Sequence, residues 1–168
     1  MGARHRGRGG VTVLRIGQGY DVHRFADDDR TMVLGGVRME GERGLLGHSD
    51  ADAVAHAVTD ALLAATGLGD IGQHFPDTDP RWKGADSMEM LAQVVAMLHE
   101  RRCTVGNVDC TVVCERPRIA PHREEMQRRL TAVVGAPVTV KGRRAEGLGA
   151  IGRGEGVMCT AVALVDVP

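Results

Sequence analysis

The sequence predicts a single α/β domain of the α+β type, in which helices cover one face of a mixed β-sheet. Three observations favour this class. The 168 residues include 43% hydrophobic residues, enough for one packed core. Short apolar runs typical of strands are interspersed with helical patterns. No internal repeat or linker divides the chain. We expect the domain to span residues 11–168, after a disordered basic tail at residues 1–10.

The predicted strands are apolar runs bounded by glycine, proline or polar residues. The first, residues 11–18, leads into an Asp-Val-His turn at residues 21–23. A hairpin is predicted where Gly35-Gly36 joins Met32–Leu34 to Val37–Met39. Three later strands complete the predicted set: Asn107–Cys114, Val138–Lys141 and Val157–Val167.

The first helix is predicted over residues 49–66, with Ser49 or Asp50 as its N-cap and Gly67 as its stop. One of its faces is apolar and points to the core. Another carries an acid–histidine–acid row, which taken alone is explained as a solvated stripe with local ion pairing. The row consists of Asp52, His56 and Asp60.

Two further helices are predicted from their ends. One runs over residues 87–101, with Asp86 and Glu89 in capping-box positions. The other runs over residues 121–135, from Pro121 to Gly135. Glycine and proline oppose regular structure in two segments. We predict loops at residues 69–80 and 147–156.

Composition excludes several classes of function. A net charge of −1 and 2% aromatic residues argue against a nucleic-acid partner. No apolar run is long enough for a bilayer, and residues 1–10 lack the apolar core of a secretory leader, so we expect a cytoplasmic protein without a membrane partner. The cysteines form no Cys-x-x-Cys pair, and we interpret them as buried thiols. They are Cys103, Cys110, Cys114 and Cys159.

A candidate metal site follows from spacing. Asp21 and His23 are two residues apart, so on an extended strand they point to the same side. Together with His56 they offer one carboxylate and two imidazoles, a ligand set that suits a catalytic zinc and leaves a fourth position open. The alternative for the Asp-x-His pair is solvation or ordinary hydrogen bonding.

Other catalytic motifs lack support. Gly-x-Gly-x-x-Gly occurs at residues 67–72 and 147–152, but neither copy lies between a strand and a helix, so NAD binding is not predicted. There is no Walker sequence and no Gly-x-Ser-x-Gly elbow. The aspartates near the candidate site require cations before it can accept a phosphate.

Read together, the motifs resemble the 2-C-methyl-D-erythritol 2,4-cyclodiphosphate synthase family of the non-mevalonate isoprenoid pathway. The resemblance covers about residues 13–166 and makes residues 11–168 a synthase-like catalytic domain. The motifs include Gly19-Tyr-Asp-Val-His23, Gly47-His-Ser-Asp-Ala-Asp52, Phe75-Pro-Asp-Thr-Asp-Pro80, Lys83-Gly-Ala-Asp-Ser87 and Gly152-Arg-Gly-Glu-Gly156.

The resemblance implies a homotrimer with active sites at its subunit interfaces. The implied substrate is 4-diphosphocytidyl-2-C-methyl-D-erythritol 2-phosphate. Its 2-phosphate attacks the β-phosphorus, and CMP leaves as the cyclic diphosphate forms. Zinc or another divalent cation would bind Asp21, His23 and His56. A second divalent cation, Mg²⁺ or Mn²⁺, would lie near Glu146.

The resemblance also implies catalytic roles for His48 and Arg144 and a set of substrate contacts. Contacts to the methylerythritol phosphate part and its pocket are Asp21, Val22, His23, His48, Ser49, Asp70, Ile71, Gly72, Phe75, Pro76, Asp77, Thr78 and Asp79. Contacts to cytidine, from the adjacent subunit, come from residues 114–120 and above all from Cys114, Pro117, Arg118, Ile119 and Ala120. The remaining contacts are Arg143, Arg144, Ala145, Glu146 and Arg153.

Two departures from the family pattern stand out. Arg144 occupies a position where relatives have a threonine that contacts the phosphates, and we hypothesise that its guanidinium partly replaces that donor. Ala150 replaces an aromatic residue that is common in the trimer channel, and this departure argues against the isoprenoid-diphosphate binding that the resemblance implies there with Arg153 and Glu155. Two alternatives to the cyclase stay open: a non-catalytic metal- or nucleotide-binding homologue, and a zinc hydrolase that uses a metal-bound hydroxide.

Overall fold

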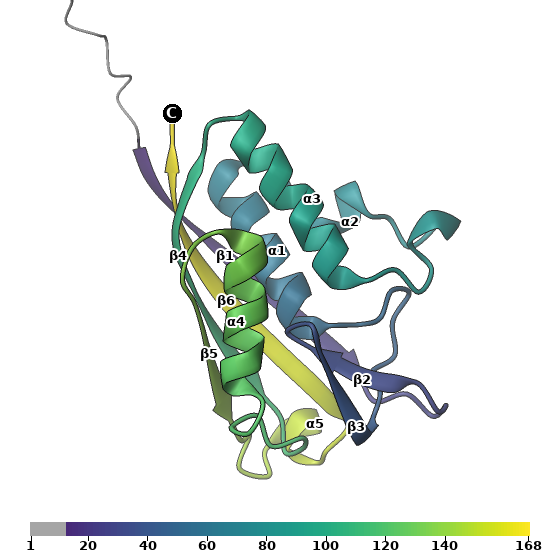
Figure 1. Ribbon diagram of the computed structural model, residues 1–168. Helices are drawn as coiled ribbons and strands as arrows, with labels where there is room; N and C mark the ends of the chain where they lie inside the picture. The colour runs from purple at the N-terminus through teal and green to yellow at the C-terminus, as the bar shows by residue number, and fades with distance from the viewer. Residues whose placement is uncertain (1–12) are drawn as a thin grey trace, which may run out of the picture.

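The structure, a computed structural model, describes residues 13–168 (Figure 1). The predicted tail and the first two residues of the predicted first strand lie outside this range. A four-stranded sheet has the order β1-β6-β4-β5, and β2 and β3 form a separate two-stranded sheet. The β4–β5 pair is parallel and the other pairs are antiparallel, so the sheet is mixed, as predicted. The strands of the larger sheet are β1 (Val13–Arg24), β4 (Thr104–Val113), β5 (Val138–Arg143) and β6 (Gly156–Val167).

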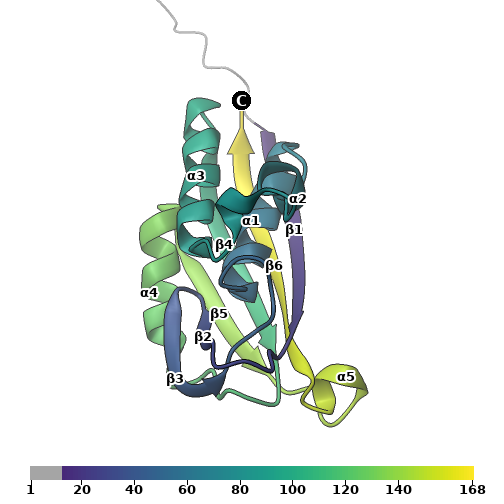
Figure 2. The same cartoon turned by 90° about the vertical axis from the view of Figure 1, so that its right-hand side faces the viewer.

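Three helices pack on one face of this sheet (Figures 1 and 2). The predicted fold class, one α/β domain with helices over a mixed sheet, is therefore confirmed. No helix of residues 13–168 is long and apolar enough to cross a membrane. The three helices are α1 (Ala53–Thr66), α3 (Ser87–Glu100) and α4 (Arg123–Val134).

Helix α1 lies unusually close to β1 because β1 has glycines where the two elements meet. A Cβ atom on Gly17 would lie 1.9 Å from the carbonyl oxygen of Ala61, and one on Gly19 would lie 1.8 Å from that of Ala57. No other residue fits at such distances. This approach carries His56 of α1 toward Asp21 and His23 of β1. The four cysteines are free and buried, as predicted.

The start of α1 differs from the prediction. Its N-cap is Asp52, not Ser49 or Asp50, and the Asp52 carboxylate accepts the N–H groups of Val54 and Ala55, both at 3.0 Å. The same carboxylate accepts two N–H groups from the hairpin turn at residues 35–36, at 2.8 and 2.6 Å. Asp52 is fully buried, so the solvated-stripe interpretation was wrong for this residue. The hairpin itself is confirmed, as β2 (Thr31–Leu34) and β3 (Val37–Arg43).

Strand β1 continues through the predicted Asp-Val-His turn, because Asp21 pairs with Cys159 and His23 with Val157 of β6. The two predicted loops contain short helices, so those predictions were wrong in part. Side chains cap two of these helices: Asp70 accepts the N–H of Gln73, and Asp79 that of Arg81. The short helices are α2 (Ile71–His74), η1 (Pro80–Trp82) and α5 (Gly149–Gly152).

Within residues 13–168, the sheet face opposite the helices remains uncovered. Side chains of β1 alternate, so that every second residue points away from the helices. Several of these are large and apolar, and Val162 of β6 joins them. Their exposed fractions are 67% for Leu14, 73% for Ile16, 52% for Tyr20, 47% for Val22 and 47% for Val162.

Candidate metal centre and substrate pockets

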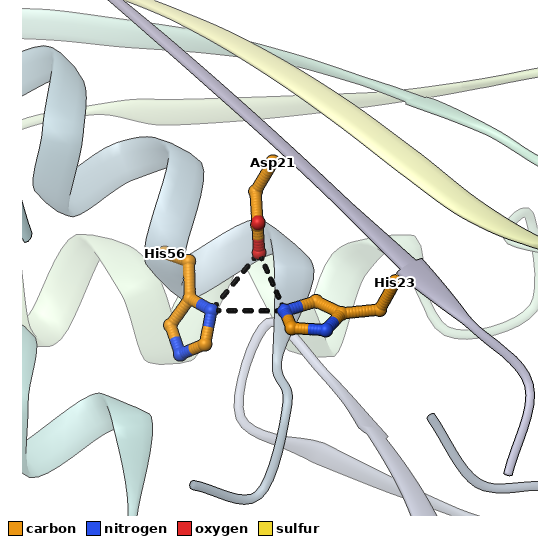
Figure 3. A group of neighbouring side chains, drawn as sticks. All are labelled: Asp21, His23 and His56. Carbon is orange, nitrogen blue, oxygen red and sulfur yellow. Dashed lines mark hydrogen bonds and ion pairs between the residues drawn. The ribbon is translucent and has the colours of Figure 1, made fainter. Parts of the chain in front are cut away.

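The three residues predicted as metal ligands lie together (Figure 3). Asp21 Oδ2 is 2.9 Å from His23 Nε2 and 2.9 Å from His56 Nδ1, and the two nitrogens are 3.3 Å apart. Two of these residues come from β1 and one from α1, so the close packing of those elements builds the cluster. Among residues 13–168 this is the one group of three potential ligands whose donor atoms all lie within 4.8 Å of one another.

Hydrogen bonds orient the ring of His23. Its Nδ1 is 2.8 Å from the carbonyl oxygen of Leu46. A carbonyl only accepts, so Nδ1 carries a hydrogen, and in the neutral ring the lone pair is on Nε2. That lone pair faces Asp21 Oδ2. Two acceptors are thus directed at one another, an arrangement that a shared proton or a cation stabilises.

Partial burial strengthens the charge interactions between Asp21 and the two histidines of the cluster. The side chains of Asp21, His23 and His56 are 22, 17 and 12% exposed. Burial by itself raises the pKa of Asp21, but the hydrogen bonds and charges of the two histidines outweigh it and hold that pKa well below its usual value. Burial lowers the pKa of His23, yet the adjacent Asp21 carboxylate prevails and raises it above 6.5.

The donor set fits a zinc ion. Ligands about 2.1 Å from a tetrahedral zinc lie about 3.4 Å from one another. The three donor atoms, 2.9 to 3.3 Å apart, need to separate only slightly to reach that spacing. The cluster also borders a pocket, which leaves room for a ligand in a fourth position.

This first pocket has a volume of about 240 Å³, and six further residues of the predicted set line it. His48 and Ser49 line it, and the Nε2–H of His48 donates to the carbonyl of Asp79 at 3.2 Å. Trp82 and Met90 also line it and were missed, although Trp82 is the single tryptophan of the chain and stands between two motif segments. The remaining lining residues were predicted: Ile71, Gly72, Phe75 and Asp77.

Other predicted contacts do not line the first pocket. The side chains of Asp70 and Asp79 are engaged as helix caps. Val22 points to the uncovered face of the sheet, away from its neighbours Asp21 and His23. Two predicted residues of the adjoining loop are also absent from the lining, Pro76 and Thr78.

A second pocket, of about 420 Å³, lies at the ends of β4 and β5. It contains all the residues predicted to hold cytidine. It also contains several residues that sequence reasoning missed; only Lys141 has a clear signal, because it alternates with Arg143 on β5. The predicted members are Cys114, Pro117, Arg118, Ile119, Ala120, Arg143 and Arg144, together with Glu115 and Arg116 of the predicted segment 114–120, and the missed ones include Arg123 and Lys141.

An ion pair with Glu115 holds the Arg144 side chain in this second pocket. Its Nε and Nη2 donate to Glu115 Oε2 at 2.9 and 2.8 Å, and the same carboxylate accepts the N–H of Ala145 at 3.1 Å. Glu146 is exposed, with a left-handed φ of 52°, and belongs neither to the cluster nor to either pocket. Arg153 pairs with Glu155 at 2.6 Å, also outside both pockets.

The single chain therefore does not bring the two predicted catalytic residues together. His48 lines the pocket beside the cluster, whereas Arg144 lines the pocket at the ends of β4 and β5. The two pockets share no lining residue.

The fold and the cluster define an α/β domain with the ligand set of a metalloenzyme. The chain belongs to the YgbB family, whose model matches residues 14–166. A 2-C-methyl-D-erythritol 2,4-cyclodiphosphate synthase of Trichlorobacter lovleyi is 50% identical over 90% of this chain and 98% of the relative. The predicted family and enzyme class, a cyclodiphosphate synthase, are thereby confirmed.

Some relatives are longer. A bifunctional enzyme IspD/IspF of Anaeromyxobacter dehalogenans is 55% identical over 90% of this chain, which spans only 40% of that relative. Among solved structures, the bifunctional IspDF of Campylobacter jejuni matches with a TM-score of 0.89 and 35% identity, over 94% of this chain and 43% of that one. A synthase structure in its CDP-bound form matches with a TM-score of 0.82 and 38% identity, over 90% of this chain and 100% of that one.

Proposed function

We propose that this chain converts 4-diphosphocytidyl-2-C-methyl-D-erythritol 2-phosphate to 2-C-methyl-D-erythritol 2,4-cyclodiphosphate and releases CMP. One observation carries the proposal: three donor atoms of the zinc-type ligand set converge beside a pocket, in a chain of this family. The CDP-bound relative supports a cytidine diphosphate-linked substrate. The expected cytoplasmic location stays a prediction.

Asp21, His23 and His56 hold the first divalent cation, for which zinc suits the donor set. When bound, the ion supplies positive charge that neutralises and polarises a phosphate of the substrate. Glu146 is proposed as a ligand of a second cation, Mg²⁺ or Mn²⁺. Its exposed position leaves its carboxylate free to meet a substrate diphosphate.

The protein's main task in this reaction is to position its substrate. The attacking 2-phosphate is already an anion, so no strong general base is required. His48 and Ser49 line the first pocket, where they are placed to contact the methylerythritol phosphate. The rings of Phe75 and Trp82, in edge contact with centroids 4.9 Å apart, form an apolar wall that limits water near the phosphates.

The second pocket supplies positive charge. Arg118, Arg143 and Arg144 line it together with Lys141, so it suits the phosphates and cytidine of the leaving group. Arg144 is proposed to donate to phosphate in place of the family's threonine, with Glu115 holding it ready.

We further propose a homotrimer in which the second pocket of one subunit completes the first pocket of its neighbour. The separation of His48 from Arg144 within one chain supports this arrangement. The uncovered sheet face supports it too, because apolar side chains such as Ile16, 73% exposed, gain by burial against another subunit.

The test combines metal-loaded protein with the cytidine-linked substrate. The cyclase releases CMP and gives a cyclic diphosphate in the phosphorus NMR spectrum. Tight binding of the substrate without release of CMP would instead identify a non-catalytic homologue. CMP with a linear product would identify a hydrolase. The mass of the native protein in solution tests the trimer.

A further inference from the structure

We infer that Asp50 and Ser87 are positioning residues that fix the tautomer of the neutral His56 ring. They keep the hydrogen on Nε2 and thereby direct the Nδ1 lone pair at the cation. The inference deepens the proposed function, since it rests on the proposed metal site. It concerns the side of the His56 ring that faces away from Asp21 and His23.

A short chain of hydrogen bonds lies behind His56. Ser87 Oγ is 2.8 Å from His56 Nε2. The Ser87 hydroxyl also bonds to Asp50 Oδ1, and the Ser87 N–H donates to Asp50 Oδ2 at 3.2 Å. Asp50 therefore grips both the hydroxyl and the main chain of Ser87. Ser87 itself is 1% exposed, so water does not compete for these bonds.

The Asp50 carboxylate determines which atom donates in each hydrogen bond between Asp50, Ser87 and His56. A carboxylate only accepts, so the Ser87 O–H donates to Asp50. The hydroxyl then has only lone pairs to offer His56, so Nε2 must carry the hydrogen and donate to Ser87 Oγ. In the neutral ring Nδ1 is left with a lone pair, and Nδ1 is the atom that lies 2.9 Å from Asp21 Oδ2.

Each histidine of the cluster thus has its own orienting acceptor. For His23 the acceptor is the main-chain carbonyl of Leu46, at 2.8 Å from Nδ1. For His56 it is the side chain of Ser87. Ser49 Oγ is a weaker second acceptor, since it lies 3.1 Å from Nε2 and also accepts the N–H of Ala51 at 3.2 Å.

Backbone bonds place Asp50 and Ser87 without any help from substrate. The N–H of Asp50 donates to the main-chain carbonyl of Ala85 at 3.0 Å, and the N–H of Gly84 donates to the main-chain carbonyl of His48 at 2.7 Å. Ser87 is the first residue of α3, which Asp86 caps. Neither Asp50 nor Ser87 lines the first pocket, so they act through His56 rather than on the substrate.

The test measures the zinc affinity of the full chain after metal removal, by competition with a chromophoric chelator. Removal of a ligand's hydrogen-bond partner typically lowers metal affinity about 10- to 100-fold, and we expect this loss for Ser87→Ala. Ser87→Thr keeps the hydroxyl and should restore most of the affinity. The control is Thr59→Val, which removes another buried hydroxyl; the Thr59 hydroxyl donates to the carbonyl of Ala55 within α1 at 2.8 Å, and not to the His56 ring.

Wild-type affinity in folded Ser87→Ala would overturn the inference, as would an equal loss in Thr59→Val. A second measurement needs no variant. In nitrogen NMR spectra of the zinc-loaded wild type, His56 should bind through Nδ1 and show an Nε2 proton protected from exchange. Ligation through Nε2, or a freely exchanging proton there, would overturn the inference.

The two proposals fail differently. If zinc binding depends on His56 but not on Ser87, only the positioning role fails. If the wild type binds no zinc, the proposed metal site fails, and the positioning role fails with it.

Discussion

The two pockets of this chain are built in contrasting ways. The pocket beside the cluster is anchored on β1 and α1, and each imidazole there has a fixed hydrogen-bond acceptor. The pocket at the ends of β4 and β5 is formed largely by loop residues and exposed arginines, with Arg144 held by a single carboxylate. The difference indicates that one chain preorganises the cation site, whereas under the proposed trimer the charged pocket takes its final form around substrate and a neighbouring subunit.

Removal of a metal ligand is the change with the largest expected effect on the cation site. We expect His56→Ala to lower zinc affinity by more than about 100-fold, since loss of a ligand exceeds loss of its hydrogen-bond partner, and to abolish CMP release. Chelator competition and a CMP assay measure the two effects. His99→Ala, in the exposed last turn of α3, is the matched control and should behave as the wild type.

The second prediction tests whether helix packing sets the cluster. In Gly19→Ala the new methyl group meets the carbonyl of Ala57 at 1.8 Å, so α1 must shift away from β1. We expect a loss of about 3 kcal/mol in the free energy of unfolding in urea, with weaker zinc binding.

Gly106→Ala is the control for this change, because its methyl group would lie at 3.4 Å from the nearest atom, an ordinary contact. Folded Gly19→Ala with unchanged zinc affinity would show that the approach of α1 to β1 does not position the ligands.

The third prediction concerns pH. Burial lowers the pKa of His23, but in the metal-free protein a proton on His23 bonds to Asp21 at the proposed cation site, and this interaction raises the pKa above 6.5. The proton therefore stabilises the metal-free fold below about pH 6.5, and this stability is lost as pH rises through the raised pKa.

Zinc competes with the same proton, so zinc affinity should fall as pH decreases, by about tenfold per unit below the pKa of His23. A titration of zinc affinity against pH measures the effect. A decline that begins only well below pH 6.5 would show that Asp21 does not raise the pKa of His23.

The smallest effect is expected in the charged pocket. Arg144→Thr should lower or preserve turnover, because it restores the family's hydroxyl but removes a charged donor. Folding stability should change little, since the Arg144 side chain is 71% exposed and Glu115 keeps its bond from the N–H of Ala145. Steady-state CMP release is the measurement. Arg128→Thr, which breaks a surface ion pair in α4, is the control. A large rise in turnover for Arg144→Thr alone would show that Arg144 slows the reaction.

Local patterns were enough to predict the cluster but not the hydrogen bonds that support it. The two-residue spacing of Asp21 and His23 on a strand has a direct geometric meaning, and the apolar face of the first helix fixes which side His56 occupies. The true cap of that helix, Asp52, was missed because half of its partners lie in a hairpin turn 16 and 17 residues earlier.

Contacts between distant segments explain the other gaps. Ser87 lies 31 residues from His56, and Glu115 lies 29 residues from Arg144, so neither pairing has a local signature. The short helices after Asp70 and Asp79 did have a local signal, since both aspartates are favoured N-caps, but the glycine and proline content of the loop outweighed it.

A crystal structure of the zinc-loaded protein, with anomalous data at the zinc edge, tests the metal centre most directly. We expect one zinc peak at about 2.0 to 2.2 Å from Asp21 Oδ2, His23 Nε2 and His56 Nδ1. A protein saturated with zinc that shows no peak among these three atoms, or shows one ligated by other residues, would contradict the proposed chemistry.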